Sequence, residues 1–143
     1  MKYMSADRVF IDSNIFVYTV DNNNPDKQKK AKSLVADIIT NKTPVISTQV
    51  IQEFYNASTK KVKIDRFLAK GIVHDLCYMV VVQVIPELIE QGIDISISAQ
   101  ISFWDGLIVA AAEFANCSTI ISEDLNDGQI IRGIKITNPF KSP

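Results

Sequence analysis

The chain has 143 residues, of which 47% are hydrophobic, and its 15 lysines and arginines nearly balance its 16 aspartates and glutamates. This length suits a single domain over residues 1–143 whose core needs no disulfide or structural metal, and the apolar content excludes disorder of the whole chain. A net charge of −1 neither indicates nor excludes a nucleic-acid partner, because local patches of charge matter more than the total.

The first part of the chain predicts a strand followed by helices. Arg8–Ile11 has the short apolar run of a buried strand, and Asp12–Asn14 behind it are residues that cap helices. Asn24 followed by Pro25 is typical of a helix start. The core-facing side of that helix is predicted from apolar residues at helical spacing, which are Ala31, Leu34, Val35, Ile38 and Ile39.

The middle of the chain predicts a second strand and two further helices. Pro44–Ser47 is expected to form the strand, and Thr48 is expected to cap a helix that continues to about Lys60. Asp65 is expected to begin the next helix, which ends near Tyr78.

The second half continues the alternation. Val80–Ile85 is β-branched and is predicted to be a buried strand, and Pro86 opens a helix. Phe103–Ala115 is apolar almost all round, so we expect a buried helix. Ser118–Ser122 and Gly133–Thr137 are the last predicted strands. We therefore predict an α/β three-layer fold with a mainly parallel central sheet of four or five strands.

Four acidic residues fall where a parallel α/β sheet gathers its functional sites. Asp12 ends the first predicted strand, and Asp124 follows the fourth. Glu53 lies in the helix after the second strand, and Asp105 lies in the first turn of the buried helix. The carboxyl ends of parallel strands meet at one edge, so these side chains are expected to converge. Clustered carboxylates repel one another, and a divalent cation with a preference for oxygen, Mg²⁺ or Mn²⁺, relieves that repulsion.

Each acid also has a purely structural explanation. Asp12 can cap a helix, Asp124 can belong to a turn, and Glu53 can be a solvated helix residue. Asp105 can complete a capping box with Ser102, although its apolar neighbours leave little water around it. A metal site is favoured by the four acids taken together, not by any one of them.

Two basic clusters and one histidine bear on the same question. The clusters are Lys27, Lys29, Lys30 and Lys32, and then Lys60, Lys61, Lys63 and Arg66. A solvated helix face and a phosphate track for RNA both fit these clusters. The single His74 cannot provide a histidine pair for acid–base cleavage of RNA or a multi-histidine zinc site, which favours metal chemistry at carboxylates.

Five segments resemble, in order, the motifs of the PIN domain, and within that family the toxins of bacterial VapBC-type toxin–antitoxin pairs. They are Phe10–Ile15, Ser47–Phe54, Ser102–Ala112, Ile121–Gln129 and Asn138–Phe140. The third is the most specific, and together they cover nearly the whole chain. The resemblance implies a metal-dependent endoribonuclease, the toxin of such a pair, that hydrolyses phosphodiester bonds of single-stranded or looped RNA.

The same resemblance implies roles for individual residues. Asp12, Asp105 and Asp124 would bind Mg²⁺ or Mn²⁺ directly or through water, and Glu53 would complete the metal site and orient the attacking water. The hydrogen-bond donors expected behind these ligands are Ser13, Asn14 and Ser122. The resemblance also implies a homodimer and a small cognate antitoxin protein whose C-terminal segment lies across the active-site groove.

The fourth motif offers three carboxylates. Asp124 stands at the predicted strand end, where the backbone is still fixed by the sheet, whereas Glu123 should point to the opposite side. Asp127 lies in a turn sequence that backbone geometry alone explains. A catalytic ligand needs a rigid support, so our hypothesis is that Asp124 is the fourth acid and that Asp127 at most assists through water.

Two other functions stay open at this point. One is a catalytically inactive PIN-like module that binds RNA or protein, which the intact acids at all four motifs argue against. The other is an aspartate-based phosphotransferase, because Asp12–Asn14 superficially resembles a nucleophile loop. That chemistry usually has a second acid two residues on, where this chain has Asn14.

The cellular setting is predicted from cysteines and apolar runs. Cys77 and Cys117 do not make a disulfide framework, so we expect reduced thiols. Met1–Arg8 lacks the apolar segment of a signal peptide, and no apolar run is long enough to cross a bilayer. We therefore expect a cytoplasmic protein without membrane contact.

Overall fold

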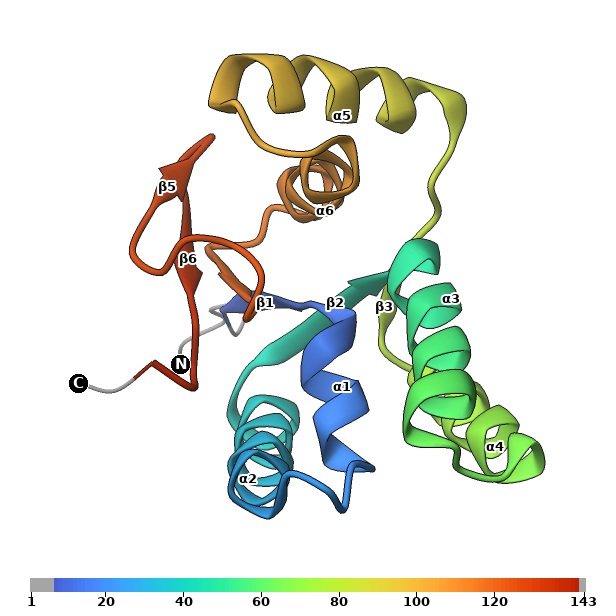
Figure 1. Ribbon diagram of the computed structural model, residues 1–143. Coiled ribbons are helices and arrows are strands. Elements are labelled where there is room, and N and C mark those ends of the chain that lie inside the picture. Colours follow the sequence, from blue (N-terminus) through green and yellow to red (C-terminus); the bar gives the residue numbers. More distant parts are fainter. Residues whose placement is uncertain (1–6, 142–143) are drawn as a thin grey trace, which may run out of the picture.

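The computed structural model describes residues 7–141 and shows a sheet between two layers of helices (Figure 1). The sheet has six strands in the order β3-β2-β1-β4-β6-β5, and only the β5–β6 pair is antiparallel. In chain order the strands are β1 (Arg8–Ile11), β2 (Thr43–Ser47), β3 (Val80–Val82), β4 (Thr119–Ile121), β5 (Ile130–Ile131) and β6 (Ile134–Thr137). The predicted α/β three-layer fold is confirmed, with one strand more than expected.

Helices cover both faces of the sheet. They are α1 (Ser13–Thr19), α2 (Pro25–Asn41), α3 (Thr48–Ala57), α4 (Arg66–Leu76), α5 (Pro86–Ala99) and α6 (Phe103–Phe114), and a π-helical turn η1 (Ser58–Val62) continues α3. Helices α1 to α4 lie on one face, and α5 and α6 lie on the other (Figure 1). Among the described residues no single helix has the length and hydropathy to cross a membrane. Only α5 and α6 together, bent by 114°, have that length and composition.

The register at the centre of the sheet brings the strand ends together. β1 lies between β2 and β4, with Phe10 paired to Val45 on one side and to Ile120 on the other. The Asp12 N–H donates to the Ile121 carbonyl oxygen at 2.9 Å, so the pairing continues one residue past the end of β1. The carboxyl ends of β1, β2 and β4 therefore share one edge, as they do at the ligand sites of open α/β sheets.

The core is built from these central strands and the helices that cover them. Helices on both faces exclude water from both sides of a parallel sheet, which is why its strands are apolar almost throughout. The largest fully buried side chains include Phe10, Ile11, Ile15, Val45, Ile46, Val50, Phe54, Ile120 and Ile136. The expected buried helix is confirmed for Gly106–Ala112. Its two ends are open, because Trp104 is 61% and Phe114 68% exposed.

Some local expectations were wrong. Ser47, not Thr48, caps α3, because the Ser47 hydroxyl accepts the Val50 N–H at 3.3 Å. The Thr48 hydroxyl instead accepts the Val84 N–H at 3.2 Å and ties α3 to the segment after β3. Ile39, expected in the core-facing stripe of α2, is 53% exposed.

The two edges of the sheet also differ from the prediction. The strand expected over Val80–Ile85 ends at Val82, and Val80 is exposed because β3 is an edge strand. At the other edge β5 and β6 form a hairpin that was not foreseen. Its two-residue turn, Arg132 and Gly133, has φ of 53° and 77°. The sequence there lacks the Asn-Gly or Asp-Gly signal of such turns.

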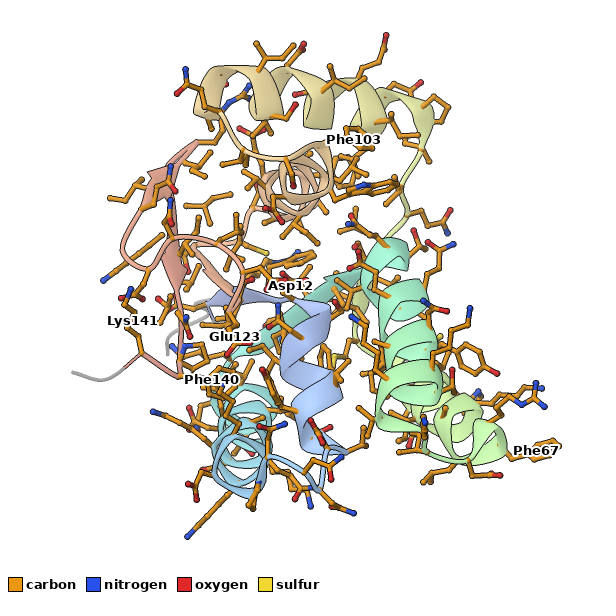
Figure 2. The ribbon with its side chains drawn as sticks, viewed as in Figure 1. Asp12, Phe67, Phe103, Glu123, Phe140 and Lys141 are labelled. Atoms are coloured by element: carbon orange, nitrogen blue, oxygen red, sulfur yellow. The ribbon has the colours of Figure 1, made fainter. Side chains whose placement is uncertain are left out.

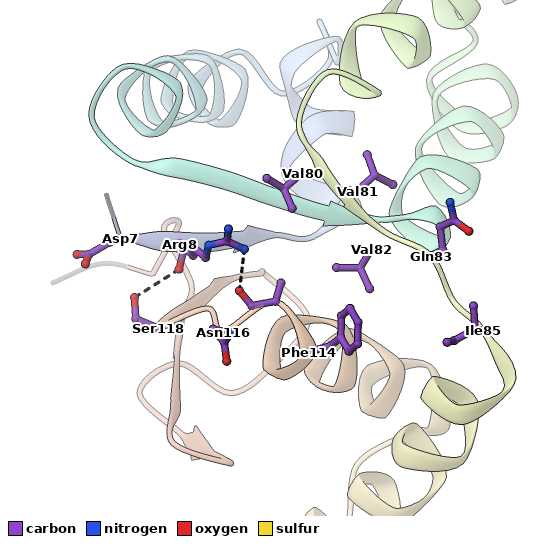
Figure 3. A pocket seen from close by; sticks show the side chains of 11 residues that line it. Asp7, Arg8, Val80, Val81, Val82, Gln83, Ile85, Phe114, Asn116 and Ser118 are labelled. Carbon is purple, nitrogen blue, oxygen red and sulfur yellow. Dashed lines mark hydrogen bonds between the residues drawn. The ribbon is translucent and has the colours of Figure 1, made fainter. Parts of the chain in front are cut away.

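Figure 3 shows a hollow on the surface that is lined by Asp7 and Arg8 at the start of β1. It measures about 750 Å³ and lies between the start of β1, the edge strand β3 and the end of α6. Arg8 lines it and donates from Nη1 to the Ala115 carbonyl oxygen at 3.0 Å. None of the four predicted acids lines this hollow.

Two glycines set the distance between α5 and α6. A Cβ added at Gly106 would overlap the carbonyl oxygen of Gly92, and a Cβ at Gly92 would lie 2.8 Å from Cδ2 of Leu107. The backbones therefore approach as closely as only glycine allows. Because Asp105 precedes Gly106 in α6, this helix crossing also fixes where Asp105 stands.

We predict that Gly106→Ala destabilises the protein by about 1–3 kcal/mol, because the added methyl group forces the two helices apart. Urea unfolding measures the difference. Gly71→Ala in α4 is the matched control, because a Cβ there meets nothing within 4 Å. Alanine is also the better helix former, so the control should be as stable as the parent or more so. Equal stability of Gly106→Ala and the parent would show that α5 and α6 separate without cost.

Candidate active site

Asp12 occupies the junction of β1 and α1 (Figure 2). Its side chain is only 4% exposed. Oδ1 accepts the Ser13 N–H at 2.7 Å, so the helix-cap explanation holds for one oxygen. Oδ2 accepts the Ser122 hydroxyl at 2.7 Å, from the residue that follows β4. A cap needs only one of these oxygens, and the second ties the ends of two neighbouring strands together.

Glu53 reaches the same place from α3. Its Oε1 accepts the Ser13 hydroxyl at 3.1 Å, and the same hydroxyl oxygen lies 3.5 Å from Asp12 Oδ1. Its Oε2 accepts the side-chain amide of Gln49 at 3.3 Å. Glu53 is half-buried, so it is not the freely solvated helix residue of the alternative explanation.

Asn14 joins Asp12 to Asp124. Its Nδ2 lies 3.4 Å from Asp12 Oδ2 and 3.1 Å from Asp124 Oδ2. Its Oδ1 accepts the Glu123 N–H at 3.2 Å, which turns the amide nitrogen toward the two carboxylates. The Asp124 N–H donates to the Ser122 hydroxyl oxygen at 3.1 Å. The three expected donors, Ser13, Asn14 and Ser122, thus all contact the predicted acids.

Asp105 stands in the first turn of α6. The Ser102 hydroxyl accepts the Asp105 N–H at 3.1 Å, which is the capping contact expected from the sequence. The side chain is half-buried beside the exposed Trp104, so this end of α6 is more exposed to solvent than its apolar sequence suggested. The capping contact uses the backbone N–H of Asp105, and a hydrogen bond with the same Ser102 also lowers the pKa of its carboxyl group.

The four acids form one electrostatic group. The pKa of Asp12 is raised from 3.8 to about 6, mainly by burial and also by the charges of Glu53 and Asp124, although hydrogen bonds from Ser122 and Ser13 act in the opposite direction. Burial also raises the pKa of Asp105, with a contribution in the same direction from the charge of Asp124 and an opposing one from a hydrogen bond with Ser102. Asp124 therefore couples the acid of α6 to the acid of β1.

No lysine or arginine among the described residues neutralises this group. The ion pairs found there are Lys27–Glu123, Lys42–Asp7 and Arg132–Glu113. Nor do any three acidic, cysteine or histidine side chains within residues 7–141 stand close enough to enclose an ion as they are placed. Ser13 and Asn14 bridge the carboxylates instead. Uncompensated carboxylates with hydroxyl and amide oxygens nearby nevertheless fit a hard divalent cation by their chemistry.

Glu123 points away from the group, as the alternation of an extended chain predicts. Its carboxylate pairs with Lys27 and accepts the Tyr18 hydroxyl at 2.6 Å. Lys27 Nζ also lies 4.9 Å from the centre of the Tyr18 ring and 5.3 Å from that of Phe140. Figure 2 shows Glu123 and Phe140 close to α2. Since the Glu123 N–H holds Asn14, this cluster anchors the segment that carries Asp124.

Asp127 has a structural contact of its own. Its Oδ1 accepts the Asn138 N–H at 2.8 Å, which fixes the loop after β4 to the end of β6. Asn14 bonds to Asp124 and to Asp12. Of Asp124 and Asp127, only Asp124 contacts Asn14, and its role as the fourth acid stays a prediction.

Sequence reasoning missed Gln49. It is buried one helical turn before Glu53, and its amide donates both to Glu53 and to the Trp104 carbonyl oxygen, each at 3.3 Å. Its Oε1 is a buried side-chain acceptor without a hydrogen-bond partner among the described residues. The available signal was that Gln49 stands four residues before Glu53, on the same face of α3. This spacing does not distinguish a glutamine that positions Glu53 from a solvated one.

The PIN domain family model matches residues 9–127. The chain belongs to the PIN domain family. The match spans β1 to the loop after β4 and so includes all four acids. No curated protein sequence matches the chain.

Solved structures of toxin–antitoxin proteins share this PIN fold. A toxin–antitoxin complex from Klebsiella pneumoniae matches with a TM-score of 0.69 and 15% identity, over 94% of this chain and 99% of that one. VapBC2 from Rickettsia felis, bound to a DNA fragment from its promoter, gives 0.65 and 18%, over 92% and 98%. VapC20 from Mycobacterium tuberculosis, a toxin that cleaves the sarcin–ricin loop, gives 0.62 and 17%, over 78% and 86%.

We predict that Asp12→Asn stabilises the metal-free protein near pH 7.5 by up to about 3 kcal/mol. The pKa of Asp12 is higher in the folded state, about 6, than its usual 3.8, so the ionised carboxylate costs stability above pH 6. As the pH falls from 6 toward 4, the folded state takes up a proton first and the parent recovers this stability. The gap between variant and parent should therefore shrink toward pH 4.

Urea unfolding in EDTA at several pH values tests this prediction. Glu90→Gln, which removes one exposed carboxylate from α5, is the control for the loss of a surface charge. A gap between Asp12→Asn and the parent that stays constant from pH 4 to pH 8 would contradict the raised pKa.

Proposed function

We propose that this PIN domain is a divalent-metal-dependent endoribonuclease and the toxin of a toxin–antitoxin pair. The observation that carries the proposal is that Ser13 links Asp12 to Glu53 and Asn14 links Asp12 to Asp124. The charge of Asp124 also raises the pKa of Asp105, and no ion pair among the described residues neutralises these acids. Family membership supports nuclease-type hydrolysis, and the similarity to VapC structures supports the toxin.

Mg²⁺ or Mn²⁺ fits the donors of this site, and Asp12, Asp105 and Asp124 would hold it with Glu53. When bound, such an ion neutralises the carboxylates, lowers the pKa of a water molecule and stabilises charge on a phosphodiester. Gln49 Oε1, beside Glu53, is a buried acceptor without a hydrogen-bond donor among the described residues, which costs free energy. This supports the binding of a further polar group next to Glu53.

The residues of the chain divide the remaining tasks. Asp12 is held in one position by hydrogen bonds from Ser13 and Ser122, so the other groups of the site are placed relative to a fixed carboxylate. Glu53 orients the attacking water toward the phosphorus, with its own carboxylate held by Ser13 and Gln49. Rigid support of this kind matters because small displacements of a reacting group cost much of the rate.

We propose a small antitoxin protein and a second copy of the chain as partners. The support is the similarity to solved toxin–antitoxin complexes and the apolar side chains that this fold leaves in water. Phe67 on α4 is 85% exposed and projects from the body of the molecule (Figure 2). Ile97 on α5 is 71% exposed. Apolar groups exposed to this degree favour association.

We predict that RNA cleavage needs Mg²⁺ or Mn²⁺ and that Asp12→Asn and Asp105→Asn each abolish it while the fold stays intact. Each asparagine keeps the shape of the aspartate but loses the ligand charge. Labelled single-stranded RNA incubated with metal or with EDTA gives the measurement, and circular dichroism checks the fold. Full activity of the parent in EDTA would refute the metal mechanism, provided that the variant preparations are inactive and so exclude a contaminating nuclease.

Asp124→Asn and Asp127→Asn form a matched pair within the same assay. The first should lose both cleavage and Mn²⁺ affinity, and the second should keep them, because Asp127 serves the loop through Asn138. The opposite result would reverse the assignment of the fourth acid. A phosphoaspartate formed from a phosphodonor would instead support the rival phosphotransferase, and RNA binding without any cleavage would support the inactive module.

We predict that coexpression with a small protein encoded immediately upstream yields a stable complex, and that the purified chain alone is a homodimer. Affinity purification followed by light scattering measures both. A chain that stays monomeric across a wide concentration range would refute the dimer, and failure of the upstream protein to copurify would refute the partner.

A further inference from the structure

A groove leads from the acids to one of the two basic clusters. It lies between α1 and α3, with a volume of about 490 Å³. Ser13, Asn14 and Asp124 line one part of it, and Glu53 lines it from α3. Two turns beyond Glu53 it is lined by Lys61 of η1. In an ideal helix the eight residues from Glu53 to Lys61 rise about 12 Å. A nucleic-acid strand whose reacting phosphate lies at the acids can therefore also reach Lys61.

A second hollow of about 490 Å³ lies beside the same helix. Asn56 lines both hollows, so the two share one wall residue. The second one is lined by Lys60, Lys63 and Arg66. Tyr55, with 37% of its surface exposed, lies in the same wall. Cations with an exposed aromatic ring between them are the features that hold the phosphates and bases of single-stranded nucleic acid.

The charge of this region is not balanced locally. Residues 60–70 contain five lysines and arginines and a single acid, Asp65. The Asp65 carboxylate is already used, because it caps α4 by accepting the Leu68 N–H at 3.0 Å. None of the ion pairs found within residues 7–141 involves these cations.

The backbone of this turn is unusual as well. η1 is a π-helical turn, a form that occurs mostly as short insertions and frequently at functional sites. Lys63 caps its C-terminal end, with a φ of 65° that is uncommon for a residue with a side chain. The turn thus sends Lys61 into the groove of the acids while Lys60 and Lys63 line the neighbouring hollow.

The other basic cluster differs in each respect. Lys29 and Lys30 border a hollow that they share with two acids, Asp26 and Asp37, and that has no lining residue in common with the groove of the acids. Lys27 is taken by its ion pair with Glu123. The sequence left both clusters open as phosphate tracks, and the structure distinguishes them.

We infer that Lys60, Lys61 and Lys63 of the turn after α3 form the binding track for the backbone of a single-stranded RNA whose reacting phosphate lies at the acids. The inference rests on the proposed ribonuclease function and specifies where its substrate runs. The cations hold phosphates outside the reacting one, and Tyr55 offers a stacking surface for a base. The track contributes to affinity and not to the chemical step.

The test measures RNA binding apart from cleavage. Asp12→Asn protein in EDTA is titrated with a fluorescent single-stranded RNA over a series of salt concentrations. In this background the variant Lys60→Gln, Lys61→Gln, Lys63→Gln should bind about tenfold or more weakly at low salt. The slope of log K against log salt should decrease by about 0.7 for each lost phosphate contact. The matched control Lys29→Gln, Lys30→Gln, Lys32→Gln removes the same charge from exposed positions of α2 and should change neither value.

A second measurement separates binding from chemistry. In the active background with Mn²⁺, the triple variant of the turn should raise KM and leave kcat unchanged at saturating RNA. The single variant Lys61→Gln, at an exposed position, should show a smaller change in the same direction and serves if the triple variant unfolds.

Unchanged RNA affinity of the turn variants, or an equal loss in the α2 control, would overturn the track while metal-dependent cleavage by the parent keeps the proposed function. Loss of affinity for a copurified antitoxin with RNA affinity retained would mean that the basic turn binds protein, which also overturns it. A parent that neither binds nor cleaves RNA would instead contradict the proposed function itself.

Discussion

The burial of one carboxylate, that of Asp12, is the constraint on which the rest of the site depends. Burying a charged group that is only 4% exposed costs free energy of folding unless hydrogen-bond donors surround it. Ser13 and Ser122 supply these donors from α1 and from the end of β4, and each has a second task. The Ser13 hydroxyl also holds Glu53, and the Ser122 hydroxyl oxygen also accepts the Asp124 N–H. The hydrogen bonds that stabilise the buried Asp12 therefore also hold Glu53 and Asp124 in place.

The same network explains how distant parts of the chain reach the site. Asn14 can bridge Asp12 and Asp124 only because the Glu123 N–H orients its amide. Glu123 in turn is held by Lys27. The adjacent acids Asp124 and Glu123 thus have different tasks. Asp124 faces the other predicted acids, and Glu123 anchors the loop through Lys27. Their alternating directions in an extended segment make both tasks possible.

A net charge near zero conceals a strongly polar groove. Its acidic end lies at the strand ends, and its basic end lies at η1, where the cations have no partner among the described residues. Such separation suits a substrate that is a chain of phosphates, because one phosphate at the acids leaves its neighbours near cations. The opposite face of the sheet, with the close α5–α6 contact at Gly92 and Gly106, holds Asp105 in position.

The sequence by itself determined the α/β alternation and predicted which four acids to examine, because periodicity, capping residues and strand-end carboxylates are local signals. Only the tertiary structure decided that Gln49 joins Glu53 to α6, that Asp127 serves a loop, and that the cations near Lys61, not those near Lys30, border the site. It also decided the hairpin at Arg132 and the short edge strand β3. The reason is physical: these outcomes depend on which helix faces lie side by side across the sheet, and the spacing of residues along one helix does not contain that information.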